Sequence, residues 1–292
     1  MRTSVALGTF DGVHKGHRAV LSTAVGCGLY TLAVTFELPP KAYFSKNALL
    51  LTNKADKTAA IKKLGVDEVV FLDFCEVKEL SAIDFFNLLC SKFSPQYLVC
   101  GEDYRFGKDR CGDIRILKTL CDENGIDLLV VPPVNENGKP VSSTDIRKLL
   151  LLGETTEANR LLDGSFSFEG TVLQGDKRGR TIGFPTANLV YPKDIAPVKN
   201  GVYACKIESD GKSYDGICNI GYRPTYKTDT VCCEAYLFDF SGDLYGKTIR
   251  IYLNKFIREE QKFSSINQLK NAIIEDCKAA KLCRQTEVKN EY

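Results

Sequence analysis

The sequence predicts two domains of different class: an α/β domain with a parallel sheet at residues 1–163, and an antiparallel β domain with a C-terminal helix at residues 164–292. In the first half, short apolar runs alternate with helical patterns, which indicates a parallel sheet covered on both faces. After Asp163-Gly164, short alternating strands with Gly, Asn and Asp turns replace the long helices, as in an antiparallel barrel or sandwich. A chain of 292 residues also favours two domains of ordinary size.

Five apolar runs, rich in leucine or β-branched residues, are the predicted strands of the parallel sheet. They are Val5–Leu7, Thr31–Phe36, Val69–Phe74, Tyr97–Cys100 and Leu128–Val131. The helices between and after them carry start and stop signals. These helices are one capped by Thr52 and stopped by Gly65, one opened by the capping box Ser81–Asp84, one over Ile114–Asn124, and two near Ser143–Gly153 and Thr156–Leu162. In the second domain, Ser265 and Gln268 form a capping box for the final helix.

The composition favours a small-molecule partner. Lys and Arg number 39 against 37 for Asp and Glu, so no strong field attracts nucleic acid or an anionic membrane. No uncharged apolar run approaches the roughly 18 residues of a membrane span. The 12 cysteines contain no CxxC pair, and the N-terminus lacks a secretory signal. We therefore expect buried free thiols rather than disulfides or zinc ligands, in a cytoplasmic protein that is a monomer or a weak homo-oligomer.

The stretch GTFDGVHKGH, from Gly8 to His17, directly follows the first predicted strand. A glycine-rich turn that opens a helix presents free backbone N–H groups, which attract a phosphate. His14 and His17 are the only histidines, and a helix that starts near Val13 would stack their rings on one face. Gly16 would let a ligand approach the backbone. The alternative is a pair of structural histidines at this spacing by chance. Since GxGxxG is absent, an ordinary dinucleotide-binding domain is disfavoured.

Further along the chain, the segment Ser142-Ser143-Thr144-Asp145-Ile146-Arg147 follows the fifth predicted strand. Hydroxyl groups at a helix start can simply cap the helix. The alternative is a second phosphate clamp that faces the histidine turn, with the Arg147 guanidinium binding phosphate oxygens. The sequence leaves both interpretations open.

In the second domain, Gly170–Leu189 reads GTVLQGDKRGRTIGFPTANL. Its glycines and basic residues describe either a mobile phosphate-binding loop or a solvated hairpin. In the PTAN segment that follows, an extended backbone would turn Thr186 and Asn188 to the same side. Two neutral oxygen donors, together with water and ATP phosphates, suit Mg²⁺.

Glu234 is the only ionised residue in the apolar run Val231–Phe238. A carboxylate enters such a strand only with a partner or a function. As a general base it could take the proton of a substrate hydroxyl while a phosphate is attacked in line. The alternative is an edge strand from which Glu234 faces water.

In the first domain, the segments GTFDGVHKGH, GEDYRFGKDRCGD and VSSTDIRKLLLLGE resemble the adenylyltransferase module of bacterial bifunctional riboflavin kinase/FMN adenylyltransferases. The resemblance implies a nucleotidyltransferase-type, Rossmann-like domain that transfers AMP from ATP to FMN, giving FAD. It implies His14, His17 and Arg147 as catalytic residues, and Asp103 and Phe106 as flavin-binding residues. The implied ATP-binding residues are Gly8, Thr9, Phe10, Asp11, Gly16, Ser142, Ser143 and Thr144. The sequence departs from the family at Phe36–Pro40, which lacks the histidine of the family's Phe-Glu-Pro-His-Pro turn.

The second domain is similar to the riboflavin kinase module of the same family, a six-stranded antiparallel barrel that phosphorylates riboflavin to FMN. The resemblance rests on GRTIGFPTANL and extends to Asn219–Thr225, Ser241–Gly246 and Phe256–Phe263. It implies Thr186 and Asn188 as ligands of Mg²⁺ and ATP, Glu234 as the base, and Arg258 at the flavin site. The implied ATP-binding residues are Gly175, Lys177, Gly179, Arg180, Gly183 and Pro185.

The expected function is therefore flavin cofactor biosynthesis in two steps, with ATP as co-substrate and FMN and FAD as products. Three alternatives remain from the sequence. One is a chain in which a single module is active, more readily the kinase because of the missing histidine. Another is a flavin-binding storage or regulatory protein without turnover. The last is cytidylyl transfer to a lipid or alcohol precursor, which fits the first domain but leaves the second unexplained.

Overall fold

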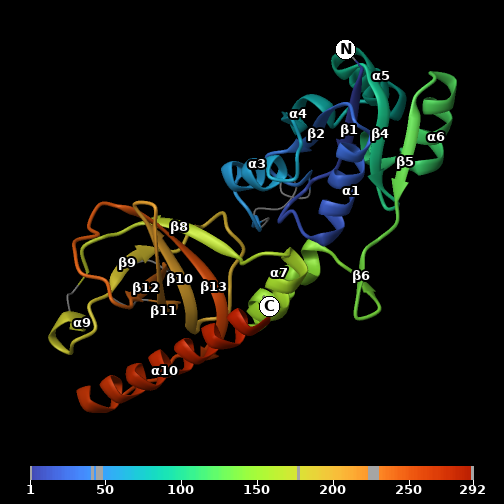
Figure 1. Ribbon diagram of the computed structural model, residues 1–292. Coiled ribbons are helices and arrows are strands. Elements are labelled where there is room, and N and C mark those ends of the chain that lie inside the picture. Colours follow the sequence, from blue (N-terminus) through green and yellow to red (C-terminus); the bar gives the residue numbers. More distant parts are fainter. Residues whose placement is uncertain (1, 41–42, 44–48, 176–177, 223–229, 291–292) are drawn as a thin grey trace. The chain divides into compact units, whose positions relative to one another are not determined.

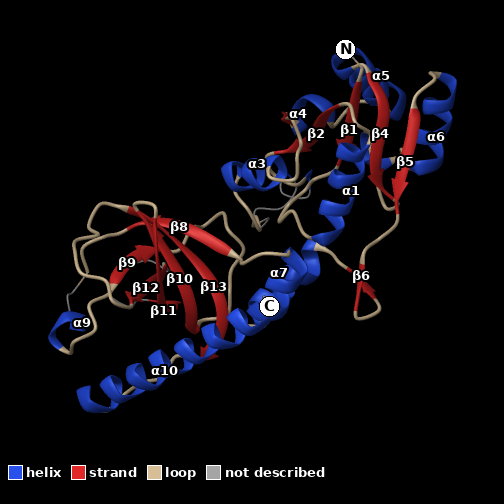
Figure 2. Cartoon of the chain, viewed as in Figure 1, coloured by secondary structure: helices blue, strands red, loops and turns tan. Residues whose placement is uncertain are grey.

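The structure is a computed structural model that describes residues 2–40, 43, 49–175, 178–222 and 230–290, without the side chains of 178 and 284–290. The chain folds into two compact units, Met1–Asp145 and Ile146–Tyr292. The predicted domain boundary at residue 163 is not tested by this division and stays a prediction. Figure 1 labels most of the elements, and Figure 2 shows that both helices and strands occur in each unit.

The first unit contains a five-stranded parallel sheet in the order β3-β2-β1-β4-β5, together with the small antiparallel pair β6 and β7. Its elements are β1 (Thr3–Leu7), α1 (Lys15–Gly26), β2 (Tyr30–Phe36), α3 (Lys54–Lys62), β3 (Glu68–Leu72), α4 (Phe74–Val77), α5 (Ala82–Phe93), β4 (Pro95–Gly101), η1 (Lys108–Arg110), α6 (Ile114–Glu123), β5 (Asp127–Val131), β6 (Asn135–Glu136) and β7 (Lys139–Pro140). Helix α7 (Ser143–Leu152) begins at the end of this unit. The predicted parallel α/β class is confirmed.

Buried side chains cover both faces of this sheet. Alternate residues of β1 point to opposite faces, so Val5 and Leu7 join one core and Ala6 joins the other. The first core is completed by α5 and α6, and the second by α1 and α3. Because both faces are buried, β1 is apolar or hydroxylic throughout, which is why its run was recognisable in the sequence.

Several predicted element boundaries differ from the structure, and at three of them a polar side chain that caps a helix is the reason. The third strand ends at Leu72 rather than Phe74, since Asp73 accepts a hydrogen bond from the Cys75 N–H and caps α4. Helix α3 is capped by Asn53 and not by Thr52. Helix α1 begins at Lys15, with His14 as its cap, instead of near Val13.

The second unit is an antiparallel six-stranded sheet in the order β8-β13-β10-β11-β12-β9. Its elements after α7 are α8 (Thr155–Leu162), β8 (Ser167–Thr171), α9 (Arg178–Thr181), β9 (Ala187–Val190), β10 (Gly201–Ser209), β11 (Lys212–Tyr222), β12 (Val231–Leu237), β13 (Thr248–Arg258) and α10 (Ile266–Asn290). A single bridge between Leu173 and Asn188 brings its two edges together, so the barrel is nearly closed. The predicted six-stranded barrel with a C-terminal helix is confirmed.

Helix α10 packs on the outside of the barrel. Half of the predicted capping box is present, because the Gln268 N–H donates to the Ser265 hydroxyl at 3.3 Å, whereas the Gln268 side chain accepts the N–H of Ser264 at 3.2 Å. Ala280 is buried against Val202 and Ala204 of β10. A second anchor is the ion pair between Arg258 of β13 and Asp276 of α10.

All 12 cysteines are free thiols, as expected. They are not all buried, however, because Cys75 and Cys111 are exposed. In the part of the chain that the structure describes, no helix is long and apolar enough to cross a membrane.

Candidate active sites

The backbone of the turn between β1 and α1 is strained. Phe10 and Val13 both have positive φ angles, of 46° and 41°. For a β-branched residue such as Val13 this conformation is a genuine outlier, which costs about 1–3 kcal/mol and persists only where its surroundings enforce it. Such outliers cluster at functional sites.

Side chains from two other segments, together with the turn's own Asp11, hold this turn. The Thr35 hydroxyl donates to the Thr9 carbonyl at 2.9 Å, and the Gly12 N–H donates to the Thr52 hydroxyl at 3.1 Å. Asp11 is 1% exposed, and its carboxylate accepts the Leu51 N–H at 3.0 Å. This carboxylate therefore fixes the loop before α3, and the ATP-binding role of Asp11 stays a prediction.

His14 and His17 stack as the spacing predicts, with ring centroids 3.6 Å apart and planes 19° apart. His14 is 5% exposed, and its Nδ1 lies 3.4 Å from the His17 N–H, which donates to it as in a helix cap. His17 is partly buried, and its Nδ1 is a buried atom without a hydrogen-bond partner among the described residues. Burial, with His14 and Lys57 nearby, holds the pKa of His17 well below its ordinary value of 6.5. His17 is therefore neutral at pH 7.

The start of α7 lies beside this turn. The Ser143 hydroxyl donates to the Asp11 carbonyl at 2.9 Å, which ties the start of α7 to the turn. Ser142 instead caps α7, because its hydroxyl accepts the Asp145 N–H at 3.1 Å. Thr144 is exposed, and Arg147 lies one turn further along α7. The structure thus brings Ser143 to the histidine turn and gives Ser142 the capping role that the sequence left open.

Four further predicted residues of this domain have defined surroundings. A Cβ on Gly8 would lie 2.7 Å from the Phe10 ring, and a Cβ on Gly16 would lie 3.2 Å from the His14 ring. The space over Gly16 is thus taken by His14 rather than left open. Asp103 is exposed, whereas Phe106 is 5% exposed and belongs to the core beside Phe85.

In the barrel, three polar residues lie opposite one another on neighbouring strands. Glu234 of β12 pairs with Asn219 of β11 on one side and with Asn188 of β9 on the other. Directly opposed residues share a face and have Cβ atoms about 5 Å apart. The neighbours Cys233 and Ala235 are fully buried, so Glu234 projects from the outer face. Because β12 is paired on both sides, the edge-strand alternative for Glu234 is wrong.

The glycine-rich loop closes over the amide at this site. A Cβ on Gly175 would lie 2.6 Å from Asn188 Nδ2, and a Cβ on Gly179 would overlap the Phe184 carbonyl oxygen. Only glycine permits these approaches. The Asn188 Nδ2 donates to the Thr186 carbonyl at 3.2 Å, which orients the amide. Gly183 has a φ of 90°, and Arg180 and Pro185 are exposed.

The structure describes only part of two of the predicted barrel segments. Lys177 and residues 223–225 lie outside the described residues. Among the residues that are described, no group of three or more His, Cys, Asp or Glu side chains is arranged to hold a metal ion.

Arg258, the predicted flavin-site residue, is bound to the C-terminal helix. Its Nε and Nη2 donate to the two carboxylate oxygens of Asp276 at 2.8 and 2.7 Å. Its guanidinium also lies over the Phe263 ring, 5.7 Å from the centroid. Two residues with clear structural roles, Asp276 and the buried Lys57, were not found by sequence reasoning. For Lys57, the four-residue spacing to the apolar Ile61 on α3 was the one available signal.

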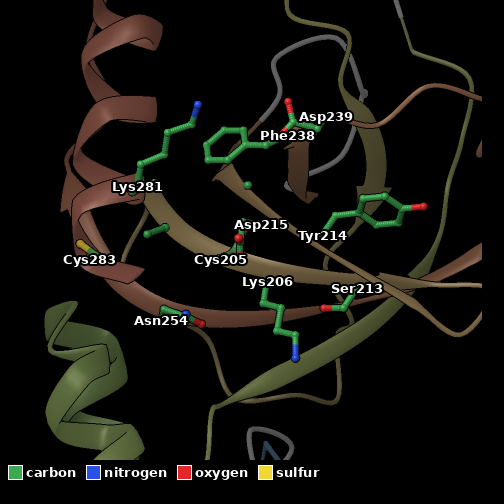
Figure 3. A pocket seen from close by; sticks show the side chains of 13 residues that line it. Cys205, Lys206, Ser213, Tyr214, Asp215, Phe238, Asp239, Asn254, Lys281 and Cys283 are labelled. Atoms are coloured by element: carbon green, nitrogen blue, oxygen red, sulfur yellow. The ribbon is translucent and has the colours of Figure 1, made fainter. Parts of the chain in front are cut away.

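A cavity of about 980 Å³ lies between the barrel and α10. Figure 3 shows Lys281 of α10 beside Phe238, which follows β12, with Lys206 and Ser213 lining the other end. Its lining includes none of the predicted site residues.

The fold and the two sites define a two-domain class: a nucleotide-transferring α/β domain with a histidine turn, and a barrel with a polar phosphotransfer site. Residues 1–145 match the family model described as FAD synthetase, and residues 162–283 match the one described as riboflavin kinase. The chain belongs to the bifunctional riboflavin kinase/FMN adenylyltransferase family, and it is an enzyme of flavin cofactor biosynthesis.

Relatives with this name cover nearly the whole chain. The one from Buchnera aphidicola subsp. Acyrthosiphon pisum is 38% identical over 93% of this chain and 90% of its own length. The one from Escherichia coli is 37% identical, with the same coverage. Among solved structures, a Streptococcus pneumoniae protein described as a macrolide-efflux protein is 32% identical, with a TM-score of 0.89 over 96% of this chain and 94% of that one.

Proposed function

We propose that this chain carries out both steps of the family's chemistry at two separate sites. The barrel transfers the γ-phosphoryl group of ATP to riboflavin, giving FMN and ADP. The α/β domain then transfers the AMP part of a second ATP to FMN, giving FAD and pyrophosphate. The observation that carries the proposal is the presence of both polar constellations, the stacked histidines and the Asn188–Glu234–Asn219 row.

In the α/β domain, a phosphate oxygen of FMN attacks the α-phosphorus of ATP, and the bond to pyrophosphate breaks. His14 and His17 stabilise the charge that develops on the phosphates. The buried Nδ1 of His17 has no hydrogen-bond partner among the described residues, and unsatisfied groups of this kind are retained at functional sites, which supports a catalytic role for this histidine. Ser143 and Arg147, on α7, are proposed to hold the distal phosphates, and Asp103 to contact the flavin.

In the barrel, Glu234 takes the proton of the riboflavin hydroxyl that attacks the γ-phosphorus. Thr186 and Asn188 would hold Mg²⁺ through neutral oxygens, a donor set that suits a hard cation. When bound, the cation neutralises the phosphate charge of ATP. The hydrogen bond from the Asn188 Nδ2 to the Thr186 carbonyl at 3.2 Å supports this role, because it fixes the orientation of the amide.

The two activities should separate by mutation, which is the experiment that tests the proposal. His17→Ala should abolish FAD formation from FMN and leave FMN formation from riboflavin within twofold of wild type. Glu234→Gln should reduce FMN formation at least 100-fold and leave FAD formation unchanged. The assay incubates the full chain with ATP, Mg²⁺ and either flavin, and separates products by chromatography.

The same assay decides the alternatives. Loss of both activities in one folded variant would contradict the separate sites. Wild-type activity with riboflavin only, or with FMN only, would show that a single module is active. Tight flavin binding without ATP consumption would favour a storage protein. The free thiols are consistent with the cytoplasm, which we propose as its location, and a monomer or weak homo-oligomer stays a prediction.

A further inference from the structure

Lys57 is a fully buried lysine beneath the histidine turn. It lies on α3 and is 0% exposed. Its ammonium donates to the carbonyl oxygens of Thr9 at 3.1 Å and Phe36 at 2.9 Å, and it lies 3.5 Å from that of Glu37. An ammonium group has three donors, so this set of main-chain acceptors matches it fully.

The three acceptors belong to the carboxyl ends of two neighbouring strands. Thr9 follows β1, and Phe36 is the last residue of β2, so Lys57 ties the two strand ends together. In a parallel sheet this edge is where ligands bind. The Thr9 carbonyl also directly precedes Phe10, one of the two residues with a strained backbone. Lys57 is therefore one of the groups that enforce this conformation.

A buried lysine is costly, which separates it from an ordinary surface residue. Burial lowers the pKa of Lys57 from 10.5 to about 8, against the opposite effects of Asp11 and Glu37. The charged and titratable groups around it are these two carboxylates and His17, whose own pKa it helps to lower. The apolar Ile61 occupies the next position on the same face of α3, so a hydrophobic side chain could fill this region without that cost.

We propose that Lys57 is a positioning residue for adenylyl transfer: its ammonium fixes the ends of β1 and β2 in the shape that receives the phosphates of ATP. This inference rests on the proposed function of the histidine turn. Lys57 acts through the backbone of Thr9 and Phe36, while its buried charge adds to the positive potential at the site.

The test uses the full-length chain with Lys57→Met, and with Lys62→Met as a matched control. Lys62 lies on the same helix but is exposed. Lys57→Met keeps an unbranched side chain that is one atom shorter, and it removes the three donors. It should lower kcat/KM for FAD formation at least 30-fold, because small misplacements of a binding turn reduce rates steeply. Riboflavin phosphorylation by the same chain, and all activities of Lys62→Met, should stay within twofold of wild type.

The second measurement is the pH profile of the wild type and of Lys57→Met. Because kcat/KM reports the free enzyme, wild-type FAD formation should fall above about pH 8 as Lys57 loses its proton, whereas Lys57→Met should lack this basic limb. A wild-type profile that is flat to pH 9.5, or a variant that keeps the limb, would overturn the proposal. The proposal would also be overturned if Lys57→Met kept a near-wild-type kcat/KM for FAD formation and His17→Ala were inactive. If His17→Ala is itself active, the proposed function of this site fails instead.

Discussion

The ion pair between Arg258 and Asp276 should be a main anchor of α10, and removing the carboxylate tests this. Asp276 is 3% exposed, and its two oxygens are both bound by the guanidinium. The substitution Asp276→Asn keeps the size of the side chain but replaces the charged acceptor. It leaves the guanidinium facing an amide that can accept at one oxygen only.

The magnitude follows from the burial of the two partners. Breaking a fully buried pair costs about 3–5 kcal/mol, because one charge is left uncompensated. The Arg258 side chain is 21% exposed, so water can reach part of the guanidinium and reduce that cost. We expect a loss of about 2–3 kcal/mol in the free energy of unfolding of the barrel unit. At roughly 4 °C per kcal/mol for a unit of this size, its Tm should fall by about 10 °C.

The matched control is Glu169→Gln, which removes a carboxylate from another arginine of β13, Arg250. The Glu169 side chain is 42% exposed, and pairs of this kind contribute about 0–1 kcal/mol. The measurement is scanning calorimetry of the full chain, because the sequence has no Trp to report by fluorescence. Equal shifts in the two variants, or a shift below 3 °C for Asp276→Asn, would refute the reasoning.

Two further predictions concern the packing of the barrel and the thiols. Gly216→Ala should destabilise the barrel by about 2–3 kcal/mol, since its Cβ would overlap the backbone oxygen of Tyr236, whereas Gly164→Ala, with no atom within 4 Å, should change Tm by less than 2 °C. In the native protein, a thiol reagent at pH 8 should modify the exposed Cys75 and Cys111 first, and interior thiols should react only on unfolding. Early labelling of the barrel interior, by mass spectrometry of peptides, would contradict the buried positions.

The sequence predicted the elements whose signal is local. All five strands of the parallel sheet were found because each contains a continuous apolar run, which in β1 and β2 reflects burial on both faces. The stacking of His14 and His17 was found because it depends only on residue spacing. The errors lie at element ends, where several polar residues compete to cap one helix. Asn53 caps α3 because Thr52 is instead bound to Gly12, forty positions earlier in the chain.

The residues that the sequence did not reveal depend on long-range contacts. Lys57 binds carbonyl oxygens of Thr9 and Phe36, and main-chain acceptors have no signature in the sequence. Asp276 looks like any acidic residue on an amphipathic helix until α10 is seen against Arg258. In both cases the structural role of the charged group is recognised only from its burial in the fold.

Glu234 shows how a single register resolves an ambiguity of this kind. In the sequence it interrupts an apolar strand, which fits either a functional carboxylate or an exposed edge. The alternation of β12 sends Cys233 and Ala235 into the barrel and Glu234 to the outer face, so the apolar neighbours and the carboxylate have different surroundings. Pairing on both sides then places it between Asn219 and Asn188. The apolar neighbours of Glu234 in the sequence therefore belong to the barrel interior. The carboxylate itself belongs to a polar row that spans three strands.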